Sequence, residues 1–445
     1  MSKKNKIILL GEVLFIGLFA KGLSLLSKIL MTRELGLEAM SIFSLVNPLI
    51  LLLLTLSSLS LQSSIASSIA KKPEKRKTIL LNAIIITLVV SSVLITLLGV
   101  FSYPISRYLL KNINTLPCVL ASIFVIPLTS ISSIIKGYFL GIGELKLTSF
   151  SQVFEECGRL LFILVILWIL PNTDTNFKAS FAVFSLCVGE VFQTLYMVIF
   201  YRNSKFNKIK VFLNLSKSKE NYYGEILKTS IPMTLSRLVG SLTYFIEPII
   251  FTSLMMKSNA NIDQITIEYG ILNSYALPLL LMPGFISVTL SNLLIPTLGQ
   301  FIRKNDYSSM KKYILKIVSL CFGIGLVISL TFFLFSSQIS SLIYGQPYGA
   351  EIIRKYSLFF IIYYVETPLI TCLAVFSMSK EAFKSTVVSS IARIILMVIL
   401  IGKYQIDGLC MAIIISTYID VFMNLVYLIL FFVRKNKSTI LFKKH

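Results

Sequence analysis

The segment KGYFLGIGELKLTSFSQVFEECGR, residues 136–159, places charged side chains between two long apolar stretches of the chain. Its charged residues are Lys136, Glu144, Lys146, Glu155, Glu156 and Arg159. An ionised side chain near the centre of a bilayer costs about 2.5–3.5 kcal/mol on insertion scales, so such residues normally face protein or water and are paired. The segment therefore predicts a turn between two membrane helices, with part of its charge inside a helical bundle.

The composition of the 445-residue chain is that of a polytopic membrane protein. Hydrophobic residues make up 56% of the sequence, charged residues 14%, and the mean hydropathy is +0.83. One or two soluble cores cannot bury that much apolar surface. The net charge of +22 would suggest nucleic acid in a soluble protein. Here the lysines and arginines form short blocks between apolar stretches, which membrane topology explains and nucleic-acid binding does not.

Twelve apolar stretches are long enough to cross a hydrocarbon core of about 30 Å as helices. They cover about residues 7–30, 40–68, 79–101, 117–140, a fifth stretch ending near 170, then 178–200, 226–256, 269–298, 312–335, 354–378, 385–402 and 407–433. The basic segments at residues 71–77 and 434–444 are expected on the cytoplasmic side together with the N-terminus. We therefore predict an all-α polytopic membrane protein with both termini in the cytoplasm.

The two halves of the sequence resemble each other at an offset of about 230 to 237 residues. The matching positions are Ser44 and Pro48 with Ser274 and Pro278, and Phe139 and Glu144 with Phe376 and Glu381. Internal repeats of this kind are common in transporters, where substrate sites lie between the repeats. We predict two six-helix lobes, residues 1–213 and 214–445, related by a pseudo-twofold axis along the membrane normal, with the substrate path in the cleft between them.

The segment quoted above resembles a family signature when it is read on to KGYFLGIGELKLTSFSQVFEECGRLLFIL. It is similar to the stage V sporulation protein B and polysaccharide-flippase branch of the multidrug/oligosaccharidyl-lipid/polysaccharide exporter superfamily, to which lipid II flippases are related. Three further segments support the resemblance: TRELGLEAMSIFSLVNPL from residue 32, IPMTLSRLVGSLTYFIEPIIFTSLM from 231 and YGILNSYALPLLLMPGFISVTLSNLLIPTLGQ from 269. The resemblance implies a lipid-linked saccharide flippase of the bacterial plasma membrane.

Polar residues inside the expected helices are the candidates for substrate binding in the cleft. They are Lys21, Lys28, Asn47, Lys136, Arg159, Arg237, Glu247, Asn273 and Arg393. Structural alternatives stay open for several of them. Lys28 can extend to the membrane interface, Arg159 has the i,i+4 spacing of an intrahelical ion pair with Glu155, and Arg237 can form an ion pair with Glu247 inside the bundle.

The excess of cations among these residues suits a polyprenyl-pyrophosphate-linked glycan, because lysine and arginine bind phosphate oxygens. We expect the two lobes to flip this substrate outward by alternating access. No GxxxxGK[ST] loop for ATP is present, so the expected driving force is a Na⁺ or H⁺ gradient or the membrane potential. We expect no metal or cofactor and no catalytic residue, since the only histidine is His445. We also expect a monomer in contact with membrane lipids.

Three other functions fit parts of the sequence. A multidrug or cation antiporter of the same superfamily would need a cavity dominated by acidic residues, whereas the buried charges here are mostly basic. A membrane polysaccharide polymerase or ligase would need catalytic groups in a large outer loop, and the expected outer loops are short. A non-transporting envelope scaffold has no need for deep cations and their cost.

Overall fold

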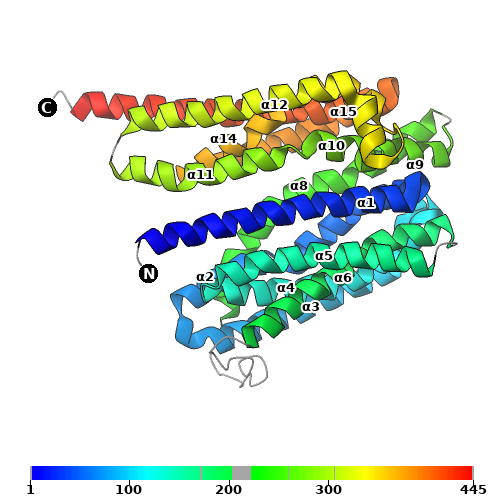
Figure 1. Ribbon diagram of the computed structural model, residues 1–445, viewed down its shortest axis with the longest axis horizontal. Coiled ribbons are helices and arrows are strands. Elements are labelled where there is room, and N and C mark those ends of the chain that lie inside the picture. Colours follow the sequence, from blue (N-terminus) through cyan, green and yellow to red (C-terminus); the bar gives the residue numbers. More distant parts are fainter. Residues whose placement is uncertain (1–2, 171–172, 203–221, 259, 305, 443–445) are drawn as a thin grey trace. The chain divides into compact units, whose positions relative to one another are not determined.

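The protein is helical and contains no strand in the residues that the structure describes, which are 3–170, 173–202, 222–258, 260–304 and 306–442 of a computed structural model (Figure 1). Contacts divide the chain into two units. Unit 1 comprises Met1–Thr252 and Asn261–Gly270, and unit 2 comprises Ser253–Ala260 and Ile271–His445. The lobe boundary predicted at residues 213 and 214 lies outside the described residues and stays a prediction.

Unit 1 is built from long helices that pack along one another, with α6 against both α4 and α5. Its elements are α1 (Lys3–Ser58), α2 (Leu61–Lys71), η1 (Pro73–Lys75), α3 (Arg76–Pro104), the π-helix η2 (Ile105–Leu109), η3 (Ile113–Thr115), α4 (Leu116–Gly141), α5 (Leu145–Ile169), α6 (Thr175–Arg202), most of α8 (Tyr223–Lys257) and α9 (Ile262–Gly270). Buried apolar residues of α1, α3, α4, α5 and α6 form one core cluster of this unit.

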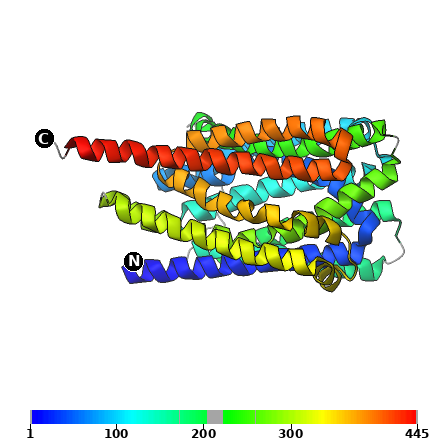
Figure 2. The same cartoon turned by 90° about the horizontal axis from the view of Figure 1, so that it is seen from above.

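Unit 2 has its own core, made by α11, α12, α14 and α15. Its elements are the π-helix η4 (Ile271–Ala276), α10 (Leu277–Leu281), α11 (Gly284–Arg303), α12 (Tyr307–Tyr344), α13 (Ala350–Tyr356), the 3₁₀ helix η5 (Ser357–Ile362), α14 (Tyr363–Val375) and α15 (Ser379–Phe442). The end of α15 is the long red helix of Figure 2.

Nine helical stretches in the described residues are long and apolar enough to span a membrane. Two of them, Gly11–Lys71 and Ser379–Val433, each cover two of the twelve expected helices, because the backbone leaves the helical conformation inside them at Gly36 and Gln405. The expected fifth helix is α5, which is not among the nine because it carries several charges. The nine stretches and α5 together account for all twelve expected helices.

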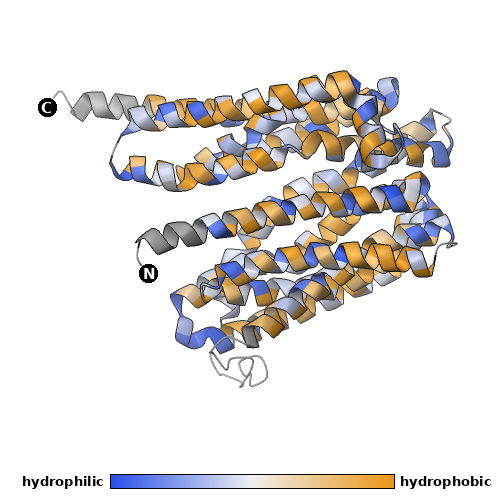
Figure 3. Ribbon diagram, in the orientation of Figure 1, coloured by the Kyte–Doolittle hydropathy of each residue, from blue (hydrophilic) through white to orange (hydrophobic). Residues whose placement is uncertain are grey.

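Apolar side chains face outward along these helices, as lipid-facing surfaces require. Trp168 of α5 is 84% exposed and Leu342 of α12 is 82% exposed. Figure 3 shows hydrophobic residues along most of the length of the helices, with hydrophilic residues gathered near several helix ends. A water-soluble protein would bury most of these side chains.

Three of the expected helices are interrupted. The stretch 40–68 breaks between α1 and α2, where Leu59 and Ser60 adopt positive φ angles of 43° and 51°. The stretch 269–298 contains the π-helix η4 and a break after Leu281, and the stretch 354–378 passes through η5. Hydropathy predicts the length of an apolar stretch but carries no information on these backbone breaks. A break is tolerated where neighbouring helices provide partners for the freed backbone groups, and these partners come from distant parts of the chain.

Serine and threonine hydroxyl groups hold the break at Leu59 and Ser60 in place. Ser57 bonds to Thr129 of α4 at 3.1 Å, and Thr234 of α8 donates to the Ser60 hydroxyl at 3.4 Å. Just beyond the break, Ser64 donates to the carbonyl of Ile226 at 2.9 Å. The broken helix is therefore bonded to two neighbouring helices of unit 1.

The turns after α4 and α14 have the same hydrogen-bond pattern. Gly143 N–H donates to Leu140 O at 3.1 Å and Glu144 N–H to Phe139 O at 2.9 Å. In unit 2, Ser377 N–H donates to Ala374 O at 3.1 Å and Met378 N–H to Leu373 O at 2.8 Å. Both are Schellman motifs, which need a residue with positive φ at the first position after the helix. The motif supports the predicted turn after α4 and its counterpart in the second half.

These two turns make a matched pair for a stability test. Gly143 has φ 88° and Ser377 has φ 60°, a region that costs a residue with a side chain about 1 kcal/mol or more. We expect Gly143→Ala to lower the free energy of unfolding by about 1 kcal/mol and Ser377→Gly to raise it by a similar amount. A Cβ atom on Gly143 would meet no atom within 4 Å, so a steric clash cannot explain a loss. Unfolding by sodium dodecyl sulfate, followed by circular dichroism, measures both changes. A stabilising Gly143→Ala or a destabilising Ser377→Gly would contradict the argument.

Candidate functional site

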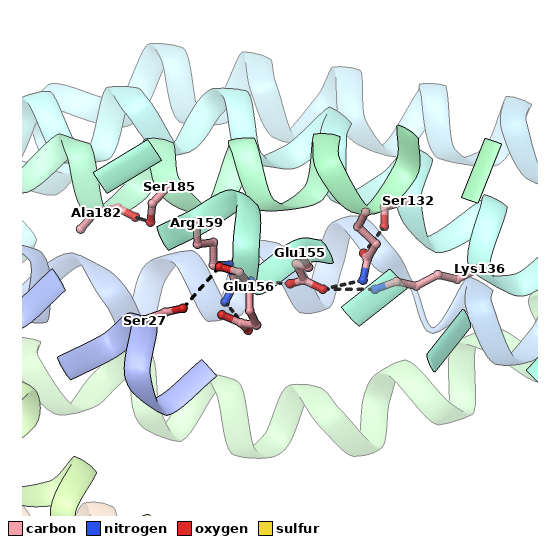
Figure 4. A network of polar contacts seen from close by, with 9 residues as sticks. Ser27, Ser132, Lys136, Glu155, Glu156, Arg159, Ala182 and Ser185 are labelled. Atoms are coloured by element: carbon pink, nitrogen blue, oxygen red, sulfur yellow. Dashed lines mark hydrogen bonds and ion pairs between the residues drawn. The ribbon is translucent and has the colours of Figure 1, made fainter. Parts of the chain in front are cut away.

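Charged side chains of α4, α5 and α6 gather inside unit 1 and form what we call the charge cluster. Figure 4 shows those of α4 and α5. Its members are Lys136 of α4, Glu155, Glu156 and Arg159 of α5, and Glu190 of α6. The side chains of Lys136, Glu155, Glu156 and Arg159 are 9–23% exposed. Two of the residues predicted to bind substrate, Lys136 and Arg159, belong to this cluster.

Glu155 is the centre of the bonding in the charge cluster. Arg159 donates to Glu155 Oε1 at 2.5 Å, and Lys136 Nζ lies 3.8 Å from Glu155 Oε2. Gln193 of α6 also donates to Glu155 Oε2 at 2.5 Å, and the Ser132 hydroxyl donates to Gln193 at 2.9 Å. The i,i+4 ion pair predicted between Glu155 and Arg159 is thus confirmed, and α4 and α6 add partners to it.

Small residues allow α5 and α6 to approach closely enough to form this network. A Cβ atom on Gly189 would lie 2.8 Å from Cγ of Arg159, and one on Gly158 would lie 2.7 Å from the ring of Phe192. Real Cβ atoms do not approach other atoms that closely, so both positions need glycine. Glycine at helix interfaces is a common means of close packing between membrane helices.

Two members of the network, Glu190 and Gln193, were not predicted from the sequence. Glu190 faces Glu155, Lys136 and Arg159, although 31 or more residues separate it from each of them along the chain. The signal that was available is a single acidic residue inside the apolar stretch 178–200, which by itself marks a functional candidate in a membrane helix. Spacing rules reveal partners only within one helix.

A pocket of about 430 Å³ lies between α1 and α8 of unit 1. It is lined by Leu51, Leu54, Thr55 and Ser58 of α1 and by Arg237, Gly240, Ser241 and Tyr244 of α8. In both helices these residues follow the spacing i, i+3, i+4, i+7, which places them on one helical face. The lining residues of α8, from Arg237 through Tyr244, therefore share one face of that helix.

Arg237 gives this pocket its chemical character. The residue is exposed, and within the described residues it forms no ion pair or hydrogen bond. The hydroxyls of Thr55, Ser58 and Ser241 donate to carbonyls of their own helices, which leaves their lone pairs as acceptors for a ligand. A guanidinium group with free donors binds phosphate oxygens in bidentate fashion.

A second pocket of unit 1, of about 490 Å³, has the opposite character. Its charged lining residues are Glu38, Asp174 and Asp263, accompanied by three asparagines and by hydroxyl side chains. The described residues that line it include no lysine or arginine. Because carboxylates repel a phosphate group, the pocket with Arg237 is the better anion site of the two.

The other predicted residues of unit 1 have different surroundings. Asn47 precedes Pro48 in α1 and lies one turn before Leu51 on the face that lines the Arg237 pocket. Lys21 and Lys28 lie in the first arm of α1, the part before the break at Gly36. Lys21 is exposed and Lys28 is half-buried, and neither has an ion pair in the part of the chain that the structure describes. Glu247 is fully buried and accepts a hydrogen bond from Tyr269 of α9 at 3.2 Å.

Asn273 and Arg393 belong to unit 2. Asn273 is buried in the π-helix η4, and Arg393 is half-buried in α15. The predicted site residues therefore fall into several groups. Lys136 and Arg159 are in the charge cluster, Arg237 lines the pocket with Asn47 on the same face of α1, and Asn273 and Arg393 are in the second unit. Substrate binding by each of them stays a prediction.

Long apolar helices that hold charged side chains inside the bundle define a multi-pass membrane protein of the transporter type. The family model described as "Polysaccharide biosynthesis protein" matches residues 10–302, and the MatE model matches residues 273–403. The chain belongs to the polysaccharide biosynthesis protein family, within the multidrug/oligosaccharidyl-lipid/polysaccharide exporter superfamily.

Curated relatives from Bacillus subtilis (strain 168) agree with this assignment. Stage V sporulation protein B is 26% identical over 383 residues, which cover 85% of this chain and 74% of the relative. The lipid II flippase MurJ is 23% identical over 298 residues, 63% of this chain and 54% of the relative. The resemblance expected from the sequence is thereby confirmed.

Solved structures show the same fold. An inward-facing multidrug resistance MATE family transporter superimposes with a TM-score of 0.72 at 13% identity, covering 96% of this chain and 99% of the transporter. The inward closed conformation of the lipid II flippase MurJ gives a TM-score of 0.69 at 14% identity, covering 96% and 90% of the two chains. At these identities the comparison supports the all-α transporter fold and says nothing of substrate.

Proposed function

We propose that the protein is a flippase that moves a polyprenyl-pyrophosphate-linked saccharide across the bacterial plasma membrane by alternating access, without chemical change to it. The observation that carries the proposal is the pocket in which the free guanidinium of Arg237 faces the hydroxyl-bearing side of α1. A pyrophosphate group supplies the anion for Arg237, and the saccharide supplies hydroxyls for the polar lining. The flippase among the relatives, and the family description, support this substrate class.

The Arg237 pocket suits this substrate better than it suits a cationic drug. A positively charged drug would be repelled by Arg237, and the described residues that line this pocket include no carboxylate that could bind it. A multidrug or cation antiporter therefore remains the less favoured function. The experiment below distinguishes this function from the proposed one.

Replacing Arg237 tests the proposal. We expect Arg237→Ala to slow flipping about tenfold or more, because a hydrogen bond to a charged group contributes about 1.5–3 kcal/mol. Arg237→Lys should retain part of the rate, since lysine keeps the charge but loses the bidentate geometry. The rate is measured in proteoliposomes with a fluorescent undecaprenyl-pyrophosphate-linked saccharide, by accessibility of the label to a membrane-impermeant quencher.

Arg303→Ala is the matched control, because Arg303 is an exposed arginine at the end of α11 and does not line the Arg237 pocket. This variant should flip at the wild-type rate. If Arg237→Ala also flips at that rate, the pocket is not the headgroup site. If the wild-type protein moves cationic drugs and leaves every polyprenyl-pyrophosphate substrate in place, the antiporter function is correct.

A further inference from the structure

The charge cluster of α4, α5 and α6 holds more carboxylates than cations. Its carboxylates are those of Glu155, Glu156 and Glu190, and its cations are Lys136 and Arg159. With every group ionised, the cluster carries one uncompensated negative charge. Such a charge is costly inside a bundle of membrane helices, because a charged group removed from bulk water needs a countercharge of its own there.

The two cations are already bonded to carboxylates other than Glu190. Arg159 donates to Glu155 at 2.5 Å and to Glu156 at 3.1 Å, and Lys136 lies 3.8 Å from Glu155. Glu190 forms no ion pair within the ranges that the structure describes. The Oε2 atoms of Glu190 and Glu156 are both buried without a hydrogen-bond partner there, and Glu156 as a residue is only 7% exposed.

Glu190 lies on α6, and the helices packed against α6 in this unit are α4, α5 and α1. The titratable and charged groups that face it are Lys136 from α4, Glu155 and Arg159 from α5, and Cys187 from its own helix. Helix α1 also packs on α6. Ser27 of α1 contacts the cluster through a hydrogen bond to the carbonyl of Glu156. The next residue, Lys28, is charged but forms no ion pair with a described carboxylate. No further described cation therefore compensates Glu190.

The missing positive charge can come from a proton or from a metal ion. A divalent metal ion needs about six oxygen ligands, with carboxylates among them, and carboxylates that are already bonded to cations are poor ligands. The described residues contain no group of three such side chains suited to a metal ion. The guanidinium of Arg159 and the ammonium of Lys136 would also repel a metal ion at this place. A proton needs only one carboxylate oxygen, and two buried oxygens are available.

We propose that the charge cluster is a proton-binding site, with Glu190 as the residue that takes up and releases one H⁺. The step forms one O–H bond, converting the carboxylate to a carboxylic acid, and its reversal returns the same proton to water. No other bond changes. The role of this site as the energy-coupling site of transport rests on the proposed function, whereas proton binding itself does not.

Infrared spectroscopy of the purified full-length protein in detergent tests proton binding directly. A protonated carboxyl group has a carbonyl stretching band that ionised carboxylates lack, and this band should appear in the wild-type protein as the pH is lowered. Glu190→Gln should lose it while keeping the wild-type circular dichroism spectrum. Glu74→Gln, at an exposed carboxylate of η1, is the matched control and should keep the buried-carboxyl band.

Lys136→Gln provides a second variant that removes a cation and leaves all carboxylates in place. It should retain the protonated band to a higher pH than the wild-type protein, because the cluster then lacks more positive charge. A band that is unchanged in Glu190→Gln would overturn the assignment to Glu190. A band that Lys136→Gln loses at a lower pH than the wild type would overturn the charge-balance argument.

Flipping rates in proteoliposomes test whether proton binding at this site drives transport, which the infrared measurement does not test. An imposed pH gradient should accelerate flipping by the wild-type protein about tenfold, and Glu190→Gln should lose this acceleration while Glu74→Gln keeps it. A wild-type rate that does not respond to the gradient would overturn proton coupling. If no polyprenyl-pyrophosphate substrate is flipped at all but the infrared band behaves as expected, the proton site stands and the proposed function fails.

Discussion

Glu155→Gln is expected to lower the free energy of unfolding of the protein by about 3 kcal/mol or more. The side chain of Glu155 is only 14% exposed and accepts hydrogen bonds from Arg159 and Gln193, with Lys136 at 3.8 Å. Removing one partner of a buried ion pair typically costs about 3–5 kcal/mol, because the remaining charge is left without compensation. With Glu190 protonated as proposed above, Lys136 and Arg159 then keep only one ionised carboxylate, that of Glu156, which contacts Arg159.

A half-exposed ion pair of the same unit provides the matched control. Glu225 of α8 pairs with Lys72 at 2.7 Å, but their side chains are 33% and 42% exposed. Exposed pairs contribute about 0–1 kcal/mol, so Glu225→Gln should have a small effect. Unfolding of the purified proteins by sodium dodecyl sulfate, followed by circular dichroism, compares the two variants under one condition.

A double variant shows whether charge compensation is the cause. If Glu155→Gln is destabilising because Lys136 loses its partner, then Glu155→Gln combined with Lys136→Gln should recover about 0.5–3 kcal/mol relative to the sum of the single changes. A loss of stability from Glu155→Gln no larger than that from Glu225→Gln would mean that the charge cluster does not hold α4, α5 and α6 together.

The charge cluster also shows how far the sequence could predict the site. Arg159 and Glu155 lie four residues apart on one helix, so their ion pair follows from spacing alone, and the structure confirms it. The contacts of Lys136 and Gln193 with Glu155 join three helices. No local rule predicts contacts between residues so far apart along the chain. Glu190 was missed for the same reason.

The fold could be predicted further than the site. Each membrane helix must satisfy its backbone hydrogen bonds within itself, so an apolar stretch of sufficient length nearly determines a helix. The breaks could not be predicted. At the break of Leu59 and Ser60 the hydroxyl of Ser130 in α4 donates to the carbonyl of Ser57 at 3.2 Å, a contact between helices that no local sequence rule predicts. At Gln405 a residue with no special turn preference adopts φ 52°, and we have no local explanation for it from the sequence.

Gly36 marks the break in α1, and Gly36→Ala is expected to have the second large effect. The backbone there has φ 80° and ψ 175°, a region that is essentially restricted to glycine and costs other residues about 1–3 kcal/mol. A Cβ atom at this position would meet nothing within 4 Å. The whole effect should therefore come from the backbone, and we expect the free energy of unfolding to fall by about 1–3 kcal/mol.

The substitution should also change the geometry of unit 1, because the break determines how the two arms of α1 are oriented. Lys21 and Lys28 lie in the first arm, whereas Asn47 and the α1 side of the Arg237 pocket lie in the second. If alanine shifts the backbone at Gly36 toward a helical conformation, the arms reorient. Spin labels at the exposed positions Leu26 and Leu51, one in each arm, should then report a changed distance by pulsed electron paramagnetic resonance.

Gly17→Ala separates this effect from the general effect of replacing a helical glycine. Gly17 lies in the first arm, and a Cβ atom there would also meet no atom within 4 Å. Because its backbone is helical, alanine should stabilise the protein by about 0.5–1 kcal/mol and leave the distance between the labels unchanged. If Gly36→Ala behaves like Gly17→Ala in both measurements, the break in α1 does not depend on glycine, and tertiary contacts of the two arms must hold it instead.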